Sequence, residues 1–576
     1  MAQAVAVNVR HFYAQRFRRE WLGRDLIAGL VLASLLVPQG MAYAELAGLP
    51  AITGLYTSLV CLIAYALVGP SRVLVLGPDS ALGSMIAATV IPLTAASGDP
   101  NKAIIYASAM ALMVGVVLVI GARAGLGFIA DLLSKPMQIG YMNGLALSIF
   151  VSQLPKLFGF SVDANGMIGE AVAFGQGVVS GETVAAALGI GLLSLAIMIV
   201  LRRLLPRVPG VLVAVVVAMV IAFIFDLAAR GVSLVGVLPS GLPPFVVPLP
   251  DIHDIPLLAV GALGIAVVSL ADTISTSSAF ASRTGQDAHA DSEMIGIGTA
   301  DLAVGFFSGF PISTSASRTA VAFEAGSKSQ VTGLVGAGVI AIVLVLLPGL
   351  FQYLPQPTLA ALVIVAAIGL ADVPATARLW RQRRSDFFLS MAAFLGVALL
   401  GVLIGILIAI ALSILAVFRR VWSPYRTVLG DVEDVPGFHD VHMYADAKQI
   451  PGLVIYRFDA PLIFANASTF REEIMAIARG EPRPAWIVIA AEPMTDIDTT
   501  AADMLTNLDG DLVVLKIRLS FAELKDAVRQ KTRTYGVALL DDDSRFYPTV
   551  SAATKAYRDE TGIERPFHGP PHRPIK

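Results

Sequence analysis

The chain has 576 residues, of which 56% are hydrophobic and 15% are charged, and its net charge is −2. Soluble domains carry roughly 25% charged residues, so this composition, with a mean hydropathy of +0.75, predicts a polytopic α-helical membrane protein. The single cysteine, Cys61, excludes a disulfide framework and cysteine-based zinc sites. Walker motifs, nucleophile elbows and zinc signatures do not occur in the sequence. ATP-driven transport and enzyme activity therefore lack support, and we expect neither a cofactor nor a nucleic-acid partner.

The sequence begins with a short basic segment, residues 1–24. Its arginines, which include Arg10, Arg16, Arg18 and Arg19, and the lack of an apolar core argue against a cleaved signal peptide and favour a cytoplasmic segment at the membrane surface. Apolar character ends near Arg419, and charged residues and prolines then return at ordinary density. We expect a transmembrane domain at 25–425, a cytoplasmic domain at 435–565 and a tail at 566–576. The chain is expected in the inner or plasma membrane, in contact with lipid.

The apolar segments predict a transmembrane domain of two halves with seven spans each. A spanning helix needs about 20 apolar residues, and fewer where it is broken. The third and tenth spans are short, so they take equivalent positions in the two halves. An odd number of spans per half makes the halves inverted repeats. The fourteen expected spans lie at 25–44, 54–69, 79–92, 103–122, 127–150, 184–203, 209–226, 257–281, 292–308, 314–325, 330–348, 357–370, 386–399 and 401–419.

Basic residues support this count. With the N-terminus inside, the expected outer loops hold only Lys102, Lys156 and Arg230. This asymmetry is what the positive-inside rule requires, and both termini are then cytoplasmic. The expected cytoplasmic loops hold Arg72, Arg123, Arg202, Arg203, Arg207, Arg283, Lys328, Arg378, Arg381, Arg383 and Arg384.

Two polar interruptions coincide with the two short spans. The stretch Phe310–Thr319 contains Pro311, five hydroxyl residues and one arginine, and Leu76–Ala81 contains a similar Gly-Pro step. Proline suits the first turn of a helix. We therefore expect each stretch to be a backbone break followed by a half-helix, whose free N–H groups and positive dipole end form an anion site. Interrupted spans at corresponding positions are typical of a transporter's binding site.

An offset of 233 residues relates the two breaks, because it separates Pro78 from Pro311. The same offset maps Gln39 onto Asp272 and Tyr43 onto Thr276. Two polar positions on the first span thus correspond to two polar positions on the eighth. Chance alignment is the alternative explanation, because Gly-Pro and serine-rich breaks are common in membrane proteins.

Several motifs of the transmembrane domain carry a family resemblance. They are Val37-Pro38-Gln39-Gly40-Met41-Ala42-Tyr43-Ala44, Leu46-Ala47-Gly48-Leu49-Pro50, Gly54-Leu55-Tyr56, Glu293-Met294-Ile295-Gly296, Gly305-Phe306-Phe307-Ser308-Gly309-Phe310-Pro311 and Ser315-Ala316-Ser317-Arg318-Thr319-Ala320-Val321. These motifs resemble those of the SulP anion transporter family, the sulfate permeases and their relatives, and the first-span signature is the longest of them. The C-terminal part is similar to the STAS domain that such transporters carry, so the resemblance covers nearly the whole chain.

The resemblance implies fourteen spans arranged as core and gate domains, substrate between the third and tenth half-helices, and a homodimer. Gln39 and Tyr43 are four residues apart, so they share a helix face and can donate hydrogen bonds to an anion. Arg318 either provides positive charge near the anion or forms an ion pair with an acid such as Asp79. The expected substrate-binding residues are Gln39, Tyr43, Ser80, Ala81, Thr314, Ser315, Ala316 and Arg318.

Asp272 is a carboxylate inside a span, which is functional by default, although a structural pair with a buried arginine is the alternative. In sodium-coupled bicarbonate importers of the family, an Asp and a Thr one turn later help to bind the cation, and they resemble Asp272 and Thr276. Oxygen ligands from these residues and Ser313 suit Na⁺, and a proton on Asp272 could serve instead. Three acidic residues are not expected, one beside an anion site and two where the family has an uncharged residue, so the net charge of the site stays open. They are Asp79, Glu45 and Asp301.

The cytoplasmic part reads as an α/β layer. A helix cap at Asp498 or Thr499 explains the loop Asp496–Ala501. That loop is also similar to the one carrying the phosphoacceptor in STAS anti-sigma antagonists, with Thr499 or Thr500 at its place. The STAS domain could also bind a cytoplasmic partner, which the resemblance does not identify. Strands are expected at Leu453–Phe458, Trp486–Ala491, Leu512–Ile517 and Val537–Leu540, and helices at 466–479, 499–508, 520–534 and 549–561.

These features indicate a secondary active transporter of a small anion, coupled to Na⁺ or H⁺. Sulfate, bicarbonate, chloride and dicarboxylates all fit an N-terminal dipole site. An uncoupled exchanger or channel is the alternative, but the fixed charge of Asp272 disfavours a pure anion pore. A nucleobase permease of the same fold normally lacks the STAS domain and the Pro38-Gln39-Gly40 signature. The fourth hypothesis is a receptor or sensor whose membrane domain does not transport.

Overall fold

The structure is a computed structural model that describes residues 18–94, 99–128, 134–162, 164, 166–205, 208–284, 289–432, 435–535 and 542–563. The first 17 residues of the expected N-terminal segment, the expected strand Val537–Leu540 and the expected tail at 566–576 lie outside the described residues. The chain divides into two compact units, Met1–Ser413 and Ile414–Lys576. Each unit is described by itself.

The first unit is helical, and each of the fourteen expected spans corresponds to a helix. The additional helices are α7 (Gly166–Val179), α15 (Val373–Gln382) and the short η1 (Arg19–Trp21). Two short strands, β1 (Leu76–Gly77) and β2 (Ser313–Thr314), precede the two short helices. The helices at the expected spans are α2 (Leu22–Leu46), α3 (Ala51–Val68), α4 (Ser80–Thr94), α5 (Pro100–Arg123), α6 (Lys135–Phe158), α8 (Ala185–Leu204), α9 (Gly210–Ile224), α10 (Ile255–Thr284), α11 (Ala290–Phe306), α12 (Ala316–Glu324), α13 (Val331–Leu346), α14 (Gln356–Leu370), α16 (Arg384–Leu400) and α17 (Val402–Trp422).

The fifth span differs from the expected one by eight residues, because it was expected at 127–150 and α6 covers Lys135–Phe158. Pro136 lies in the first turn of α6, where its missing N–H costs nothing. Gly159 ends the helix in the left-handed conformation, with φ of 87°. Hydrophobicity alone cannot locate these ends, because the apolar run extends past both of them.

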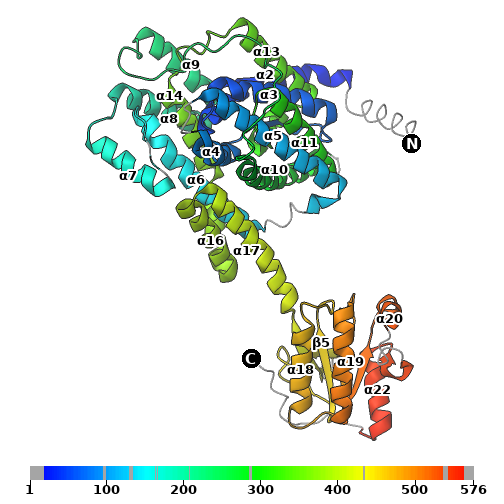
Figure 1. Cartoon of the computed structure of the whole chain (residues 1–576). Coiled ribbons are helices and arrows are strands. Elements are labelled where there is room, and N and C mark those ends of the chain that lie inside the picture. The colour runs from blue at the N-terminus through cyan, green and yellow to red at the C-terminus, as the bar shows by residue number, and fades with distance from the viewer. Residues whose placement is uncertain are drawn as a thin grey trace. The chain divides into compact units, whose positions relative to one another are not determined.

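The helices of the first unit gather into two bundles. One bundle contains α2–α5 and α10–α13, in which α11 packs on α5 and α13 packs on α2 and α3. The other contains α6–α9 and α14–α16, in which α6 packs on both α14 and α16. Figure 1 shows α2, α3, α5, α11 and α13 together, with α7, α8 and α9 to one side. Each half of the sequence thus gives its first four spans to one bundle and its later spans, except α17, to the other.

Close helix crossings hold these bundles together. A Cβ at Gly140 of α6 would lie 2.0 Å from the Ser390 carbonyl oxygen of α16, and one at Gly144 would lie 2.8 Å from the Phe394 oxygen. This four-residue spacing of glycines lets two membrane helices approach closely. In the other bundle, Asp25 is fully buried and its carboxylate accepts hydrogen bonds in the turn before α13.

The second unit is a six-stranded sheet with helices on both faces. The strand order is β4-β3-β5-β6-β7-β8, with β5 to β8 parallel and β3 antiparallel to both of its neighbours. Alternate residues of β5 point to opposite faces, so Val454 and Tyr456 pack with α18 and α19, whereas Leu453 and Ile455 pack with α22. The elements are β3 (Arg426–Val432), β4 (Val435–Asp440), β5 (Leu453–Phe458), α18 (Ala467–Arg479), β6 (Trp486–Ala490), α19 (Thr499–Val514), β7 (Arg518–Ala522), α20 (Asp526–Arg533), η3 (Asp543–Arg545), β8 (Phe546–Tyr547) and α22 (Val550–Thr561).

Two local expectations for this unit were wrong. The expected strand Leu512–Ile517 is the end of α19 followed by a turn, because Leu508 and Leu512 are spaced for one buried helix face. Lys516 has φ of 61° and ends this segment, and the strand follows at β7. The strands β3 and β4 were also missed, and β3 pairs with β5 inside the sheet.

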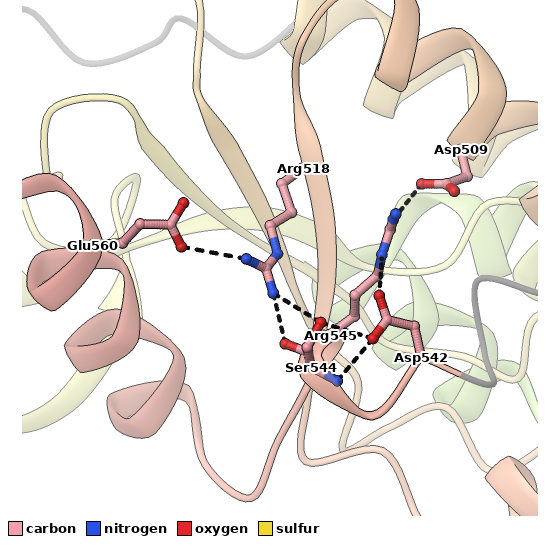
Figure 2. A network of polar contacts seen from close by, with 6 residues as sticks. All are labelled: Asp509, Arg518, Asp542, Ser544, Arg545 and Glu560. Atoms are coloured by element: carbon pink, nitrogen blue, oxygen red, sulfur yellow. Dashed lines mark hydrogen bonds and ion pairs between the residues drawn. The ribbon is translucent and has the colours of Figure 1, made fainter.

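A network of charged side chains fixes the turn at 542–545 against the sheet (Figure 2). Arg518 on β7 donates to the Ser544 carbonyl oxygen at 2.7 Å and pairs with Glu560 of α22 at 3.3 Å. Arg545 pairs with Asp509 of α19 at 2.6 Å. The side-chain and backbone hydrogen bonds from Ser544 lower the pKa of Asp542 below its usual range. The network therefore joins β7, α19 and α22 through a single turn.

Candidate functional site

The two backbone breaks lie side by side. β1 and β2 pair in antiparallel fashion, with Leu76 opposite Thr314 and Gly77 opposite Ser313. Ser315 N–H donates to the Val75 carbonyl oxygen at 3.1 Å, and the Thr319 hydroxyl accepts from Val75 N–H at 3.1 Å. Because α4 and α12 each begin within three residues of these strands, their N-termini start from one place in the fold.

Each half-helix has its own side-chain cap. Ser315 accepts from Arg318 N–H at 3.4 Å at the start of α12, and Asp79 accepts from Ala81 N–H at 2.9 Å at the start of α4. Asp79 therefore has a local partner for its carboxylate. The expectation that proline opens each half-helix was wrong, since Pro311 lies five residues before Ala316 and Pro78 two residues before Ser80. The caps, not the prolines, start these helices.

Arg318 reaches from α12 to the other break. Its side chain is 2% exposed, and its Nη1 donates to the Pro78 carbonyl oxygen at 2.5 Å. A Cβ at Gly77 would lie 3.4 Å from Nη2, so the lack of a side chain there leaves room for the guanidinium. Within the described part of the chain, Nε and Nη2 of Arg318 are buried without a hydrogen-bond partner. Of the two alternatives for Arg318, a bond to an acid such as Asp79 is not made among the described residues, and the guanidinium bonds to a backbone carbonyl instead.

Helix α10 holds β2 in place through two hydroxyl residues four positions apart. Ser269 donates to the Ile312 carbonyl oxygen at 2.8 Å, and the hydroxyls of Thr273 and Thr314 are 2.7 Å apart. On α11, the Asp301 carboxylate is fully buried and accepts from Ile312 N–H at 3.0 Å through Oδ1. Among the described residues its Oδ2 has no partner.

Several expected site residues meet at the breaks. Tyr43 is 5% exposed and lies close to Ser80, with Asp79 and Arg318 within electrostatic range. Asp272 is half-buried on α10 and interacts electrostatically with Asp79. Ala316 is exposed at the start of α12, whereas the side chains of Ser80, Ala81, Ser313 and Thr314 are buried.

Other expected ligands are not joined to this group by a hydrogen bond. In the residues that the structure covers, the side chains of Gln39, Asp272 and Thr276 make no hydrogen bond, although Thr276 is only 5% exposed. No group of three or more His, Cys, Asp or Glu side chains that suits a metal ion is present among the described residues. A cation at Asp272 and Thr276 would thus depend on hydroxyl and backbone oxygens.

Sequence reasoning missed three residues of this site. Ser269 and Thr273 clamp β2, and their four-residue spacing of hydroxyls on one apolar span was the available signal. Tyr141 on α6 is fully buried within electrostatic range of Asp272 and Asp79. Its position comes from the packing of two distant spans, so no local pattern indicates it.

In the second unit, Thr499 is the exposed first residue of α19. Asp498 caps that helix by accepting from Ala501 N–H at 2.8 Å and also accepts from Phe464 N–H at 2.7 Å. The capping role expected at this loop therefore belongs to Asp498, which leaves the hydroxyl of Thr499 free of that function.

Comparisons with known proteins match both units. A profile described as the sulfate permease family matches residues 22–393, and a STAS domain profile matches residues 444–553. A probable sulfate transporter of Mycobacterium tuberculosis is 40% identical over 549 residues, which cover 94% of this chain and 97% of the relative. Human solute carrier family 26 member 6 is 32% identical over 79% of this chain and 63% of its own length.

Solved structures of similar fold cover either almost the whole chain or its transmembrane part. The overall structure of SLC26A9 superposes with a TM-score of 0.89 at 22% identity, covering 98% of this chain and 94% of that one. The transmembrane domain of the cyanobacterial bicarbonate transporter BicA has a TM-score of 0.60 at 20% identity and covers 68% of this chain and 98% of that one. The likeness to both structures shows the fold.

Proposed function

We propose that this chain, which belongs to the sulfate permease family, is a secondary active transporter that binds a small anion between the N-termini of α4 and α12. The family is one of transporters, not enzymes, and a fold of two helical bundles suits alternating access to a site between them. Relatives of the chain are named as sulfate transporters, so sulfate is the first substrate to test.

The observation that carries the proposal is the buried guanidinium of Arg318. A buried charged group is costly unless it is paired, and two of its nitrogens have no partner among the described residues. The N-terminus of α4 adds the positive end of a helix dipole at the same place. An anion bound there would supply the missing acceptors, with Tyr43, Ser80, Ala81, Ser315 and Ala316 around it and Gln39 and Thr314 contributing from the adjacent elements.

Coupling to Na⁺ or H⁺ is the second part of the proposal. Asp79 and Asp272 lie in electrostatic range of each other, so an incoming anion meets two carboxylates and one guanidinium. A cation at Asp272, held as Na⁺ with Thr276 and Ser313 or as a proton, would remove one of these negative charges. We infer that the cation and the anion bind together, which is the basis of symport.

Uptake into proteoliposomes tests this function. The purified chain is reconstituted and supplied with labelled sulfate, bicarbonate, chloride or a dicarboxylate, with and without sodium and pH gradients. Accumulation against a gradient supports symport, whereas equilibration that no cation gradient affects supports an exchanger or a channel. Ser315→Trp should fill the space between the half-helices and abolish binding. Ser134→Trp is the matched control, because Ser134 precedes α6 without making a capping hydrogen bond.

We further propose that Thr499 is a phosphoacceptor through which a cytoplasmic partner regulates the STAS domain. Its exposure and its place in the first turn of α19 suit a phosphate, because the helix dipole stabilises negative charge there. The working assembly is proposed to be a homodimer in the plasma membrane with both termini in the cytoplasm. Phosphorylation of wild type but not of Thr499→Val by a cytosolic extract, with Thr500→Val as control, tests the assignment.

A further inference from the structure

An apolar cavity lies in the bundle of α6–α9 and α14–α16, away from the two breaks. It has a volume of about 410 Å³ and is lined by α6, α14, α15 and α16. Three of its lining side chains, Leu147, Phe150 and Ile368, are large, apolar and exposed, so the cavity opens outward between the helices. On a surface that faces a bilayer, such an opening faces hydrocarbon.

Two polar side chains that line this cavity, those of Asn143 and Thr376, are already hydrogen-bonded. The Asn143 side chain donates to the Thr376 hydroxyl at 2.9 Å and accepts from Asp372 N–H at 2.7 Å. Asp372 in turn caps α15 by accepting from Ala375 N–H at 2.8 Å. The cavity therefore offers little to a polar ligand, and its chemistry suits a hydrocarbon chain.

Helix α15, which closes one end of the cavity, has the pattern of a helix that lies at a membrane interface. Ala375 and Leu379 turn inward, whereas Val373 and Trp380, seven residues apart, are exposed on one face. The Trp380 ring packs against Phe387 of α16 with ring centroids 4.8 Å apart, which fixes α15 to its neighbour. Exposed tryptophan and an apolar stripe on a basic helix are typical of the headgroup level of a bilayer.

Positive charge gathers at the same end. Arg383 pairs with Asp386 at 3.6 Å and Arg384 lies over the Trp380 ring at 5.5 Å. In the described part of the chain, the exposed Arg378 and Arg381 have no ion-pair partner. They are three residues apart on α15, so they share a face, which points about 150° away from the cavity-lining Thr376 on an ideal helix. Their long side chains can reach a headgroup around the C-terminal end of α15, where Arg381 lies roughly 7 Å along the helix from Thr376.

We propose that this cavity binds one acyl chain of an anionic phospholipid whose headgroup is held by Arg378 and Arg381. The pair gives the headgroup charge complementarity that a neutral lipid lacks, and the cavity gives the chain a fixed place. The site lies on the side where the positive-inside rule puts the cytoplasmic leaflet, which carries the anionic lipids. Lys135, exposed at the start of α6, adds a third positive charge at that end.

Native mass spectrometry of the full chain tests the site. The protein is exchanged into nanodiscs of phosphatidylglycerol and phosphatidylcholine mixed in equal parts, released, and its retained lipids are counted. Wild type should keep phosphatidylglycerol selectively. Arg378→Gln with Arg381→Gln should lower this selectivity by roughly thirty-fold, given about one favourable charge contact per arginine. Ala371→Trp, which narrows the cavity, should reduce retention of both lipids.

Matched variants separate the site from general effects. Arg202→Gln with Arg203→Gln removes two exposed arginines from the end of α8, and Val216→Trp adds a bulky side chain on the exposed face of α9, so both should match wild type. Arg378→Lys with Arg381→Lys keeps the charge and should keep selectivity, which shows that loss in the glutamine variant is not misfolding. Unchanged selectivity in the glutamine variant overturns the proposal. The proposal is also overturned if Ala371→Trp dissociates the dimer while lipid retention stays at the wild-type level. The cavity would then be an interface between two copies of the chain.

Discussion

At the scale of single residues, Arg318 connects the two breaks. The guanidinium is oriented by its bond to the Pro78 carbonyl oxygen, and this bond leaves Nε and Nη2 for another acceptor. Lysine carries the same charge but has no rigid fork of donors, so it cannot both hold Pro78 and face a ligand in the same way. The planar geometry of arginine should thus matter as well as its charge.

Replacing Arg318 should weaken anion binding to an extent that depends on the new residue. Arg318→Gln removes the charge and should lower affinity about tenfold to a hundredfold, which corresponds to one or two charge-assisted hydrogen bonds. Arg318→Lys should fall between this variant and wild type. The dissociation constant for sulfate, measured by calorimetry in detergent, gives the comparison. Arg283→Gln, which removes an exposed arginine from the end of α10, is the control. Wild-type affinity in Arg318→Gln would place the anion elsewhere.

Asp272 is expected to set the cation dependence. A bare carboxylate about 4 Å from a monovalent anion repels it by about 4 kcal/mol at an effective dielectric constant near 20, or about three decades of affinity. Bound Na⁺ or H⁺ removes this cost. Asp272→Asn should therefore uncouple uptake from the cation gradient while retaining anion binding, and Thr276→Ala should weaken sodium dependence but not proton dependence.

Anion affinity titrated against sodium concentration and pH distinguishes these outcomes. The two variants are compared with wild type and with Asp254→Asn, which alters an acid bonded to Tyr106. If Asp272→Asn responds to both cations as wild type does, Asp272 has a structural role and the coupling mechanism is wrong.

At the scale of helices and strands, the start of each element depends on contacts that a local pattern does not contain. Pro78 and Pro311 suggested an offset of 233 residues between halves, and the starts of α2 and α10 do differ by 255 − 22 = 233. The starts of α4 and α12 differ by 316 − 80 = 236, because Asp79 and Ser315 are the caps. Polar, proline-containing stretches predicted that the two breaks exist, and the caps determine the residue at which each half-helix begins.

Close approach at one helix crossing gives a sharp stability test. Alanine favours a helix over glycine by about 1 kcal/mol, so Gly189→Ala, at a site with open space, should stabilise the protein slightly. Gly140→Ala should instead destabilise it by about 1–3 kcal/mol through overpacking, because its Cβ would meet the Ser390 oxygen of α16 at 2.0 Å. Thermal unfolding in one detergent compares the pair. Equal shifts in the same direction would mean that α6 and α16 are further apart.

At the scale of the whole molecule, the sequence was sufficient for the fold class, because apolar runs and motif resemblance extend over most of the chain. The fourteen spans, the two breaks and the α/β tail all follow from local patterns. Tyr141, Asp301 and the bond from Arg318 to Pro78 do not, since each depends on segments that are distant in sequence and meet only in the folded unit. The start of the sheet was missed for the same reason: β3 is defined by its pairing with β5.

The position of β3 determines where the chain can be divided. The candidate site residues from Gln39 to Arg318 all belong to the first unit, so a chain that ends at Trp422, after α17, should fold and bind the anion. A chain that ends at Val432 keeps β3 without β4 and β5, its partners on either side. Val428, Leu429 and Val432, which are buried in the sheet, would then be exposed on an unpaired strand. Such a strand is a template for aggregation.

We therefore expect the chain ending at Trp422 to elute as a single species in size-exclusion chromatography and to bind sulfate with the affinity of the full chain. The chain ending at Val432 should bind similarly when freshly prepared but form larger species with time and concentration. Charged substitutions at Val428 and Leu429 in that longer chain should suppress the larger species. Loss of binding by a chain that ends at Trp422 and remains folded, as judged by its thermal unfolding, would mean that the second unit contributes to the anion site.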